Sequence, residues 1–491
     1  MMTSLPIVRT IAAALALAPV AAAGVPSPSP AAAAPRRPNV LFIAIDDLND
    51  WVGHLGGHPQ ARTPNIDRLA QRGVTFTRAH CAAPLCNPSR AALLSGLRPS
   101  DTGVYRNETD WREAVPRDAV TLPLHFKRNG YDVAGAGKID HESFRRDSDW
   151  DDYATPKEEG RDPRPGGDTG VGGIQFAPLE ARDEDLRDYR VVSWVIDKLH
   201  GPHEKPFFLA CGLHKPHMPW NVPRNYFDLF PLDQIVLPRV LETDLDDVPA
   251  AGVRMAAPQG DHRRILESGR WKEAVQGYLA AGAFADAMVG RLLEALDKSP
   301  HRDDTIVVLW GDHGWHLGEK LHWRKFTLWE EATRAPLIFV VPGVTRAGGV
   351  CARTVDFMSL YPTLADLCGL PVPGHVHGPS LRPLLADPGA PWDRPALTTY
   401  LVGNHAVRSE GWRYIRYRDG SEELYDEAAD PLEWTNLAAR PELAAVKAEL
   451  ARWLPQANAP DPGPGARAPN DARPAAKRAA RRAQRAARPL P

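Results

Sequence analysis

The sequence predicts an α/β fold, in which a mainly parallel sheet is covered by helices on both faces and is followed by a small antiparallel subdomain. Continuous apolar runs such as Asn39–Ile45 are typical of parallel strands that are buried on both faces. These runs alternate with helical patterns through most of the chain, which favours helices on both sides of one sheet. After about Pro391 the predicted strands are shorter, and Asp419-Gly420 marks a hairpin turn, which indicates the antiparallel subdomain.

Local signals predict the individual elements in chain order. Asn39–Ile45 is the first strand. A helix is predicted to begin at Thr63-Pro64, because Thr caps a helix and Pro suits its first turn, and to end at Gly73. The stretch 147–183 is rich in Asp, Gly and Pro, so we expect an irregular surface insertion there. The remaining predictions are strands at 74–76, 131–134, 206–210, 305–310, 336–341, 406–408 and 412–417, and helices at 122–129, 189–199, 271–298 and 356–367.

The first residues of the chain predict export. Arg9 precedes an apolar run from Ile11 to Ala23 that ends in small residues. This pattern is typical of a secretory signal peptide, here 1–23, and is too short to span a bilayer. A buried N-terminal helix is the alternative. Residues 24–37 are rich in Ala, Pro and Ser and predict a linker. No other apolar run reaches the length of a membrane span, so we expect a soluble protein in the periplasm or outside the cell.

The rest of the chain is predicted to comprise an α/β domain at 38–390, the antiparallel subdomain at 391–457 and a basic, Pro/Ala-rich tail at 458–491. The composition, 43% hydrophobic and 24% charged, is that of a globular protein. Residues 473–488 of this tail hold seven of the 59 basic residues and no acidic one, so the rest of the chain carries 52 basic against 61 acidic residues. Such a tail could bind a polyanion, but a solvated, disordered tail is the simpler interpretation. No nucleic-acid partner is expected.

The chain has an odd number of cysteines. In an exported protein most cysteines are structural or form disulfides. If one is reserved for another role, the other four could pair, and the sequence does not define which would pair with which. The five are Cys81, Cys86, Cys211, Cys351 and Cys368.

Acidic residues follow two of the predicted strands directly. Asp46 and Asp47 end the first strand, and Asp312-His313 follows the strand at 305–310. Open α/β sheets place their sites at these carboxyl ends. Three carboxylates within ~4 Å of one another would repel by about 4 kcal/mol per pair at an effective dielectric constant near 20. A divalent cation removes that cost, and oxygen ligands favour Ca²⁺ or Mg²⁺ over Zn²⁺. Acidic residues that merely solvate strand ends are the alternative.

Basic residues recur in the loops that follow the predicted strands. Taken singly, a histidine or lysine in a loop is most often a surface residue. Together they would suit an anionic ester, whose charge needs cations and whose leaving oxygen needs an acid. His313 could ligate the cation or donate a hydrogen bond to the bound anion. The other candidates are Lys138, His141, His214 and Lys325, and Lys320 lies five residues before the last of these.

The most specific motif is Cys86-Asn87-Pro88-Ser89-Arg90, which continues to Leu94-Ser95-Gly96 and reads C-x-P-S-R-x-x-x-L-S-G. Pro88 suits the first turn of a helix, and a helix N-terminus favours an anion beside Cys86. A structural cysteine is the alternative. The pattern resembles the signature of the type I sulfatases, in which a maturation enzyme oxidises the cysteine to formylglycine and the aldehyde hydrate is the nucleophile.

Further blocks extend this resemblance over most of residues 38–440. In order, they are NVLFIAIDDLNDW, TPNIDRLA, CNPSR, GKIDH, PFFLACGLHKPHMPW, GDHGWHLGE and APLIFVVPG. They are similar to the iduronate-2-sulfatase branch of the sulfatases. The resemblance implies an alkaline-phosphatase-like fold and makes 38–390 the catalytic domain. It also implies calcium, with Mg²⁺ as a possible substitute, held by Asp46, Asp47, the formylglycine from Cys86, Asp312 and His313.

The resemblance also implies roles for the basic residues. Arg90 would brace the formylglycine and the metal loop, and Lys138 and Lys325 would bind sulfate. His141 would assist the formylglycine hydrate, and His214 would protonate the leaving oxygen. The implied mechanism is covalent: one hydroxyl of the hydrate attacks sulfur, and the second then expels sulfate, an exit that a serine ester lacks.

The implied substrate is a sulfated sugar or polysaccharide. Four tryptophans near the blocks could stack on sugars or could simply pack in the core: Trp111, Trp220, Trp315 and Trp323. Two other functions stay open. A phosphate or phosphonate ester hydrolase of the same superfamily can share the cysteine motif, and a non-catalytic binder of sulfated polysaccharide could use the basic tail.

Overall fold

A sheet of eight strands forms the centre of the computed structural model, which describes residues 1–2, 37–141, 144–167 and 169–463. The strand order is β13-β2-β12-β9-β1-β7-β3-β4. The predicted signal peptide after residue 2, nearly all of the linker and the tail from residue 464 lie outside the described residues. The strands are β1 (Asn39–Ile45), β2 (Val74–His80), β3 (Asp132–Gly137), β4 (Asp152–Tyr153), β7 (Phe207–Leu213), β9 (Thr305–Gly311), β12 (Leu337–Val340) and β13 (Gly349–Asp356).

The sheet is mainly parallel, so the predicted fold class is confirmed. β1 pairs in parallel with β7 and β9, β3 with β7 and β4, and β2 with β13. The exception is β12, which is antiparallel to both β2 and β9. Its apolar sequence predicts a buried strand but carries no information on direction, because any strand covered on both faces is apolar throughout.

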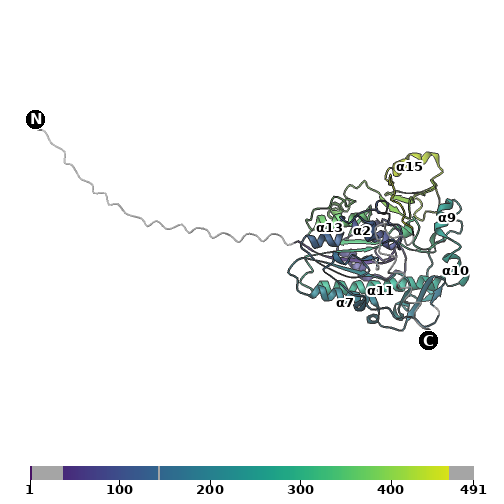
Figure 1. Cartoon of the computed structure of the whole chain (residues 1–491), viewed down its shortest axis with the longest axis horizontal. Helices are drawn as coiled ribbons and strands as arrows, with labels where there is room; N and C mark the ends of the chain where they lie inside the picture. The colour runs from purple at the N-terminus through teal and green to yellow at the C-terminus, as the bar shows by residue number, and fades with distance from the viewer. Residues whose placement is uncertain (3–36, 142–143, 168, 464–491) are drawn as a thin grey trace, which may run out of the picture. The chain divides into compact units, whose positions relative to one another are not determined.

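Helices cover both faces of this sheet (Figure 1). Along β1, Leu41, Ile43 and Ile45 contribute to one hydrophobic core, and the alternate residues Val40, Phe42 and Ala44 contribute to the other. The continuous apolar run of β1 follows from this double burial. The first core is completed by α1 (Pro64–Arg72), α7 (Arg187–His200) and α11 (Trp271–Lys298), and the second by α2 (Cys86–Ser95), α5 (Leu122–Arg128), α13 (Leu360–Leu367) and α14 (Arg382–Ala386).

The stretch 147–183 is not an irregular surface insertion, and that prediction is wrong. It contributes β4 to the edge of the main sheet and forms α6 (Pro156–Glu159), β5 (Gly170–Val171) and β6 (Ile174–Leu179). β6 pairs in parallel with β8 (Trp220–Pro223), and Ile174 and Phe176 are buried in the first core. These elements are too short to leave a periodic pattern among the surrounding Asp, Gly and Pro residues.

The C-terminal sheet is small and antiparallel, as predicted. Its order is β14 (Ala396–Thr399), β15 (His405–Arg408), β16 (Trp412–Arg416) and β17 (Glu422–Asp426). The predicted turn at Asp419-Gly420 joins the last two strands, and Gly420 has the positive φ of 87° that favours glycine. Arg413 connects this sheet to the segment that precedes β12. It is buried, donates to the backbone oxygen of Leu328 at 3.0 Å, and pairs with Glu330 and Glu433.

Shorter helices connect these layers. Those used below are α9 (Ala250–Ala256) and α10 (Asp261–Ser268). The others are α3 (Pro99–Thr102), α4 (Trp111–Ala114), α8 (Arg224–Phe227), α12 (Glu330–Thr333) and α15 (Ala444–Ala451), and a two-residue ladder joins β10 (His316–Leu317) to β11 (Trp323–Arg324).

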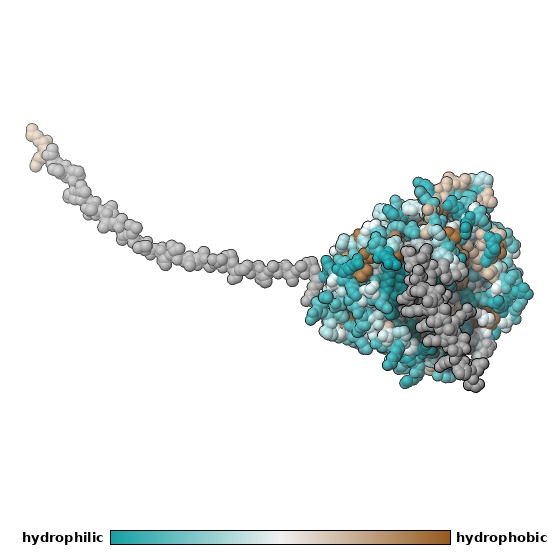
Figure 2. Space-filling view, viewed as in Figure 1, coloured by the Kyte–Doolittle hydropathy of each residue, from teal (hydrophilic) through white to brown (hydrophobic). Residues whose placement is uncertain are grey.

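The surface and the cysteines bear on the prediction of export. Within the described ranges, the structure has no helix with both the length and the apolar character that a membrane crossing requires. On the face seen in Figure 2, the described surface is mostly hydrophilic, with apolar residues scattered over it. All five cysteines are buried and free, so the disulfides that their number allowed are not present in this structure.

Candidate active site

The site is assembled at the carboxyl edge of the main sheet. The neighbouring strands β9, β1, β7 and β3 run in parallel, so their carboxyl ends lie at one edge. In that order they are followed by Asp312-His313, Asp46-Asp47, His214 and Lys138. The backbone N–H of Asp47 donates to Oδ1 of Asp312 at 2.9 Å, which ties two of these strand ends together.

Cys86 is the first residue of α2, which packs in the second core, and it reaches the same edge of the sheet from that face. The side-chain amide of Asn87 donates to the backbone oxygens of Arg106 at 2.9 Å and Thr109 at 2.8 Å. The hydroxyl of Ser89 donates to the backbone oxygen of Asp312 at 2.6 Å. The polar residues of the cysteine motif therefore fix the start of α2 against the end of β9.

Arg90 holds the acidic residues together from within the fold. Its side chain is 1% exposed. Nε donates to Asp312 Oδ2 at 2.9 Å and Nη2 to Asp46 Oδ1 at 3.2 Å. Nη1 donates to the backbone oxygens of Lys138 and Ile139. A single guanidinium thus positions carboxylates from two strand ends and the loop after a third.

The acidic cluster has the composition of a cation site. Ligand atoms of Asp46, Cys86, Asp312 and His313 all lie within 4.8 Å of one another, and those of Asp46, Asp47, Cys86 and His217 do so as well. Oδ2 of Asp47 is buried and accepts no hydrogen bond from the described residues. Burial raises the pKa of Asp47, and the nearby Asp46 raises it further. The residues present therefore fit a hard divalent cation, which would satisfy the orphaned oxygen.

Two lysines also enter this cluster. Nζ of Lys325 lies 2.6 Å from Asp47 Oδ1 and 2.9 Å from Cys86 Sγ, and Nζ of Lys138 contacts Asp46 Oδ2. Burial works to lower the pKa of each lysine, but the paired aspartate outweighs it and the pKa of both is raised. Both amines are therefore cations. Lys320 points elsewhere: its Nζ lies 2.7 Å from Asp244 Oδ1 and contacts the backbone oxygen of Glu433.

The thiol of Cys86 is not activated by these surroundings. Burial raises its pKa to about 12, and the negative charge of Asp46 adds to this effect. Because the nucleophilic form of cysteine is the thiolate, unmodified Cys86 is a poor nucleophile at neutral pH.

His214 is oriented by a residue that the sequence did not single out. Its Nδ1 lies 3.1 Å from Oδ1 of Asp188, a buried residue in the first turn of α7. The backbone N–H groups of His214 and Lys215 donate to the same carboxylate at 2.9 and 2.8 Å. Burial works to raise the pKa of Asp188, but these hydrogen bonds lower it, so Asp188 is ionised and accepts from Nδ1–H of His214. No motif links Asp188 to His214 along the chain.

His217 is a second residue that sequence reasoning missed. Its Nε2 lies 4.0 Å from Asp47 Oδ2, and its side chain is 39% exposed. A cavity of about 290 Å³ opens here; it is lined by Gly160, Arg161, Asp162, Arg187, His214, Lys215, His217, Met218 and Pro219. His141 lies on the loop after Lys138 and stacks on Phe144 with ring centroids 5.9 Å apart. Its role beside Cys86 rests on the resemblance alone.

The four tryptophans considered as sugar platforms are core residues. Trp111, Trp220, Trp315 and Trp323 are at most 2% exposed. Trp220 and Trp315 pack edge to face with ring centroids 6.1 Å apart. The packing interpretation is therefore the correct one, and these four rings are not available to stack on a ligand.

Comparisons with known proteins show which proteins this chain is similar to. Residues 38–370 match the family described as sulfatase, and residues 311–459 match the C-terminal part of N-sulphoglucosamine sulphohydrolase. A sulfatase of Formosa agariphila is 40% identical over 451 residues, which cover 86% of this chain and 87% of that protein. Iduronate 2-sulfatase of Homo sapiens is 31% identical over 411 residues, 72% of each chain.

The fold is also that of solved enzymes. The crystal structure of a phosphonate monoester hydrolase of Agrobacterium radiobacter superposes with a TM-score of 0.72 at 24% identity, covering 85% of this chain and 94% of that one. This likeness concerns the fold, which the resemblance to alkaline-phosphatase-like enzymes predicted.

Proposed function

The chain belongs to the sulfatase family, whose members are sulfuric ester hydrolases, and we propose that it is an exported sulfatase acting on a sulfated sugar or polysaccharide. The observation that carries the proposal is the position of Cys86, which lies at the start of α2 within reach of Asp47, His313 and Lys325. Cys86 thus lies between the carboxylates of the candidate cation site and a buried lysine, which supports a role in attack on an anionic ester.

The proposed nucleophile is formylglycine made from Cys86 by a maturation enzyme. The high pKa of the unmodified thiol supports a need for such a conversion. As a hydrate, the aldehyde supplies one hydroxyl to attack sulfur and a second to expel the sulfate. We propose that His141 accepts the proton of the second hydroxyl and that Arg90 holds the residue in place through Asp46 and Asp312.

In this proposal the lysines bind the sulfate, a histidine protonates the leaving group, and the acidic residues hold a metal cation. Lys138 and Lys325 bind the sulfate oxygens, where negative charge is retained in the transition state. His214 gives the proton of Nε2 to the leaving alkoxide, and Asp188 stabilises the ring by accepting from Nδ1. Asp46, Asp47, Cys86, Asp312 and His313 would hold Ca²⁺. When bound, the cation would offset the charge of the carboxylates and polarise the sulfate oxygens.

A phosphonate or phosphate ester hydrolase is the second candidate, because the chain shares its fold with such an enzyme. The test compares kcat/KM for 4-nitrophenyl sulfate, 4-nitrophenyl phosphate and 4-nitrophenyl phenylphosphonate on protein made in a host that converts the cysteine. We expect the sulfate ester to be preferred by about tenfold or more, equivalent to at least 1.4 kcal/mol of differential transition-state binding. A preference for either phosphorus ester would overturn the assignment, and no turnover of any ester would favour a binding protein.

Asp188→Asn tests the proposed acid. The amide cannot stabilise a protonated His214, so we expect kcat to fall by about 10²-fold for an alkyl sulfate, whose leaving oxygen needs a proton. For 4-nitrophenyl sulfate, whose leaving group needs little protonation, the loss should be small. Asp162→Asn is the control: Asp162 lines the cavity that His214 also lines, and its replacement should affect both esters alike. Equal losses on both esters for Asp188→Asn would show that Asp188 only supports the fold.

A further inference from the structure

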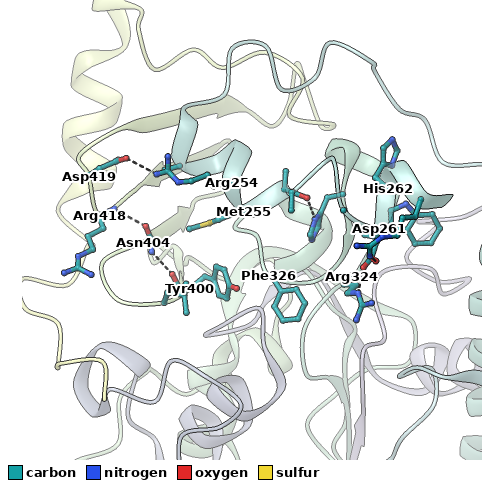
Figure 3. Close-up of a pocket in the computed structure, with 18 residues that line it drawn as sticks. Arg254, Met255, Asp261, His262, Arg324, Phe326, Tyr400, Asn404, Arg418 and Asp419 are labelled. Atoms are coloured by element: carbon teal, nitrogen blue, oxygen red, sulfur yellow. Dashed lines mark hydrogen bonds and ion pairs between the residues drawn. The ribbon is translucent and has the colours of Figure 1, made fainter. Parts of the chain in front are cut away.

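A second, larger cavity lies on the other side of the Lys325 loop. Its volume is about 930 Å³, within the range of small-molecule sites. Its wall combines α9, the start of α10, residues 322–326, and the segments at 400–404 and 418–419 of the C-terminal sheet. Figure 3 shows the rings of Phe326 and Tyr400 side by side, with Arg324 and Asp261 on one side and Arg254 and Arg418 on the other.

This cavity shares its wall with the reaction centre. Arg324 and Phe326 line the cavity, and Lys325 between them reaches Cys86 Sγ at 2.9 Å on the other side of the loop. The backbone N–H of Phe326 donates to the oxygen of Pro84, two residues before Cys86. Consecutive Cα atoms are about 3.8 Å apart, so the cavity begins one residue along the chain from the sulfate-binding lysine.

The backbone of this wall is held in an unfavourable conformation. Arg324 and Phe326 have φ values of 78° and 84°, and Ala257 and Leu401 on the facing walls have 45° and 55°. Residues other than glycine rarely adopt positive φ values. Where they do, the surrounding structure imposes the conformation, commonly at ligand sites. Positive φ at both neighbours of Lys325 turns Arg324 and Phe326 into the cavity while the lysine enters the buried cluster.

The side chains offer an anion site beside an aromatic surface. Nε of Arg324 donates to Asp261 at 2.6 Å, and its terminal nitrogens make no hydrogen bond within the described part of the chain. A Cβ at Gly173 would lie 2.2 Å from Nη2, so this glycine leaves room for the guanidinium. The rings of Phe326 and Tyr400 have centroids 6.3 Å apart and are tilted by 40°. Both rings are partly exposed, unlike the four buried tryptophans.

The cavity carries a net positive charge. Its lining includes four arginines and two aspartates: Arg254, Arg264, Arg324, Arg418, Asp261 and Asp419. The remaining titratable residues add no charge near neutral pH, since burial lowers the pKa of His262 to about 4 and lowers that of His322, and raises that of Tyr400 to about 12. A fork of free N–H donors next to an aromatic face recognises a carboxylate or sulfate on a ring with an apolar side.

We propose that this cavity binds the sugar unit next to the sulfated one, that the unit is anionic, and that Arg324 holds its carboxylate or sulfate while Phe326 and Tyr400 pack on the ring. The inference rests on the proposed function and narrows it: the substrate is an acidic oligosaccharide or polysaccharide, and the sulfated unit in the small cavity is followed by a charged neighbour in the large one.

The test measures binding separately from turnover. The ligands are two heparin-derived tetrasaccharides, one fully desulfated so that only carboxylates remain, and one carboxyl-reduced so that only sulfates remain. Isothermal titration compares the wild-type protein with Arg324→Gln and with Arg263→Gln, a control on α10 that pairs with Glu267 outside the cavity. We expect Arg324→Gln to weaken binding of one tetrasaccharide by about tenfold, because a charge-assisted, two-pronged contact is lost. Weaker binding of the desulfated tetrasaccharide would identify a carboxylate as the recognised anion, and weaker binding of the carboxyl-reduced one would identify a sulfate.

Turnover and thermal stability are measured on the same variants. Arg263→Gln, outside the cavity, should leave turnover of 4-nitrophenyl sulfate unchanged as well as binding of both tetrasaccharides. If Arg324→Gln melts at a lower temperature than the wild type, Arg324→Lys replaces it, since lysine keeps the positive charge beside Asp261 but lacks the planar fork of donors. Equal affinity of the variants and the wild type for both tetrasaccharides would overturn the inference. Failure of the wild type to cleave any sulfate ester would instead overturn the proposed function, and the binding comparison would still decide the role of the cavity.

Discussion

Cys86→Ala is expected to lower kcat for a sulfate ester by about 10⁴-fold or more while the protein stays folded, because removal of a covalent nucleophile leaves only the binding groups. The side chain is small and lies at the first position of α2, so its loss leaves the contacts of Asn87 and Ser89 in place. The measurement is steady-state turnover of 4-nitrophenyl sulfate, with the thermal midpoint of unfolding as the check on folding.

Cys211→Ala is the matched control. This cysteine is equally buried, lies in β7 and takes no part in the acidic cluster. Its loss should cost stability and leave kcat within about twofold, as expected for a core substitution remote from the chemistry. Cys86→Ser adds a diagnostic outcome: a serine that attacked sulfur would keep the sulfo group, since it has no second hydroxyl to expel it. Turnover by Cys86→Ala comparable to that of the wild type would contradict the assignment of the nucleophile.

Lys325→Met should lower kcat/KM by about 10²- to 10³-fold, because a cation aimed at the retained charge of the sulfate is lost from a water-poor site. Lys320→Met, five residues earlier in the same loop, should have the opposite profile. It would leave the buried carboxylate of Asp244 and the backbone oxygen of Glu433 unpaired. We expect the free energy of unfolding to fall by about 3–5 kcal/mol, while the folded fraction retains its kcat.

The two lysine variants are measured by urea denaturation and by turnover per folded molecule. Lys325→Met is expected to lose turnover and Lys320→Met to lose stability. A general weakening of the loop would affect both variants in the same way, so it cannot explain this difference. The assignment is contradicted if Lys320→Met loses turnover per folded molecule while Lys325→Met keeps it.

Much of the fold follows from the sequence because burial leaves a clear signature. The bounds predicted for α11, 271–298, are those in the structure, and β1 was also predicted at its observed bounds. Both are long or continuously apolar. The burial signature does not reveal short elements or strand direction. It therefore did not predict the reversal of β12, the strands within 147–183, or β13, in which Val350 and Ala352 are exposed.

The sequence predicts those site residues that directly follow neighbouring parallel strands, because the ends of these strands lie close together. Asp46, Asp47 and Asp312 follow neighbouring parallel strands, so the topology alone brings them together. The pairing of Asp188 with His214 was not predictable, because it joins the start of a helix to a loop after the next strand and neither residue stands in a motif with the other. Only the three-dimensional structure distinguishes Lys325 from Lys320, since a turn between them directs the two amines to different partners.

The central claim is that Cys86 is converted to the nucleophile, and one measurement tests it most directly: the mass of the tryptic peptide 79–90 from protein made in its native host. The peptide contains Cys81 as well as Cys86, so after reduction and alkylation Cys81 serves as an internal standard. We expect one alkylated cysteine and a second position that has lost about 18 Da relative to cysteine and reacts with a hydrazide, as an aldehyde does. Two alkylated cysteines in active protein would contradict the covalent mechanism.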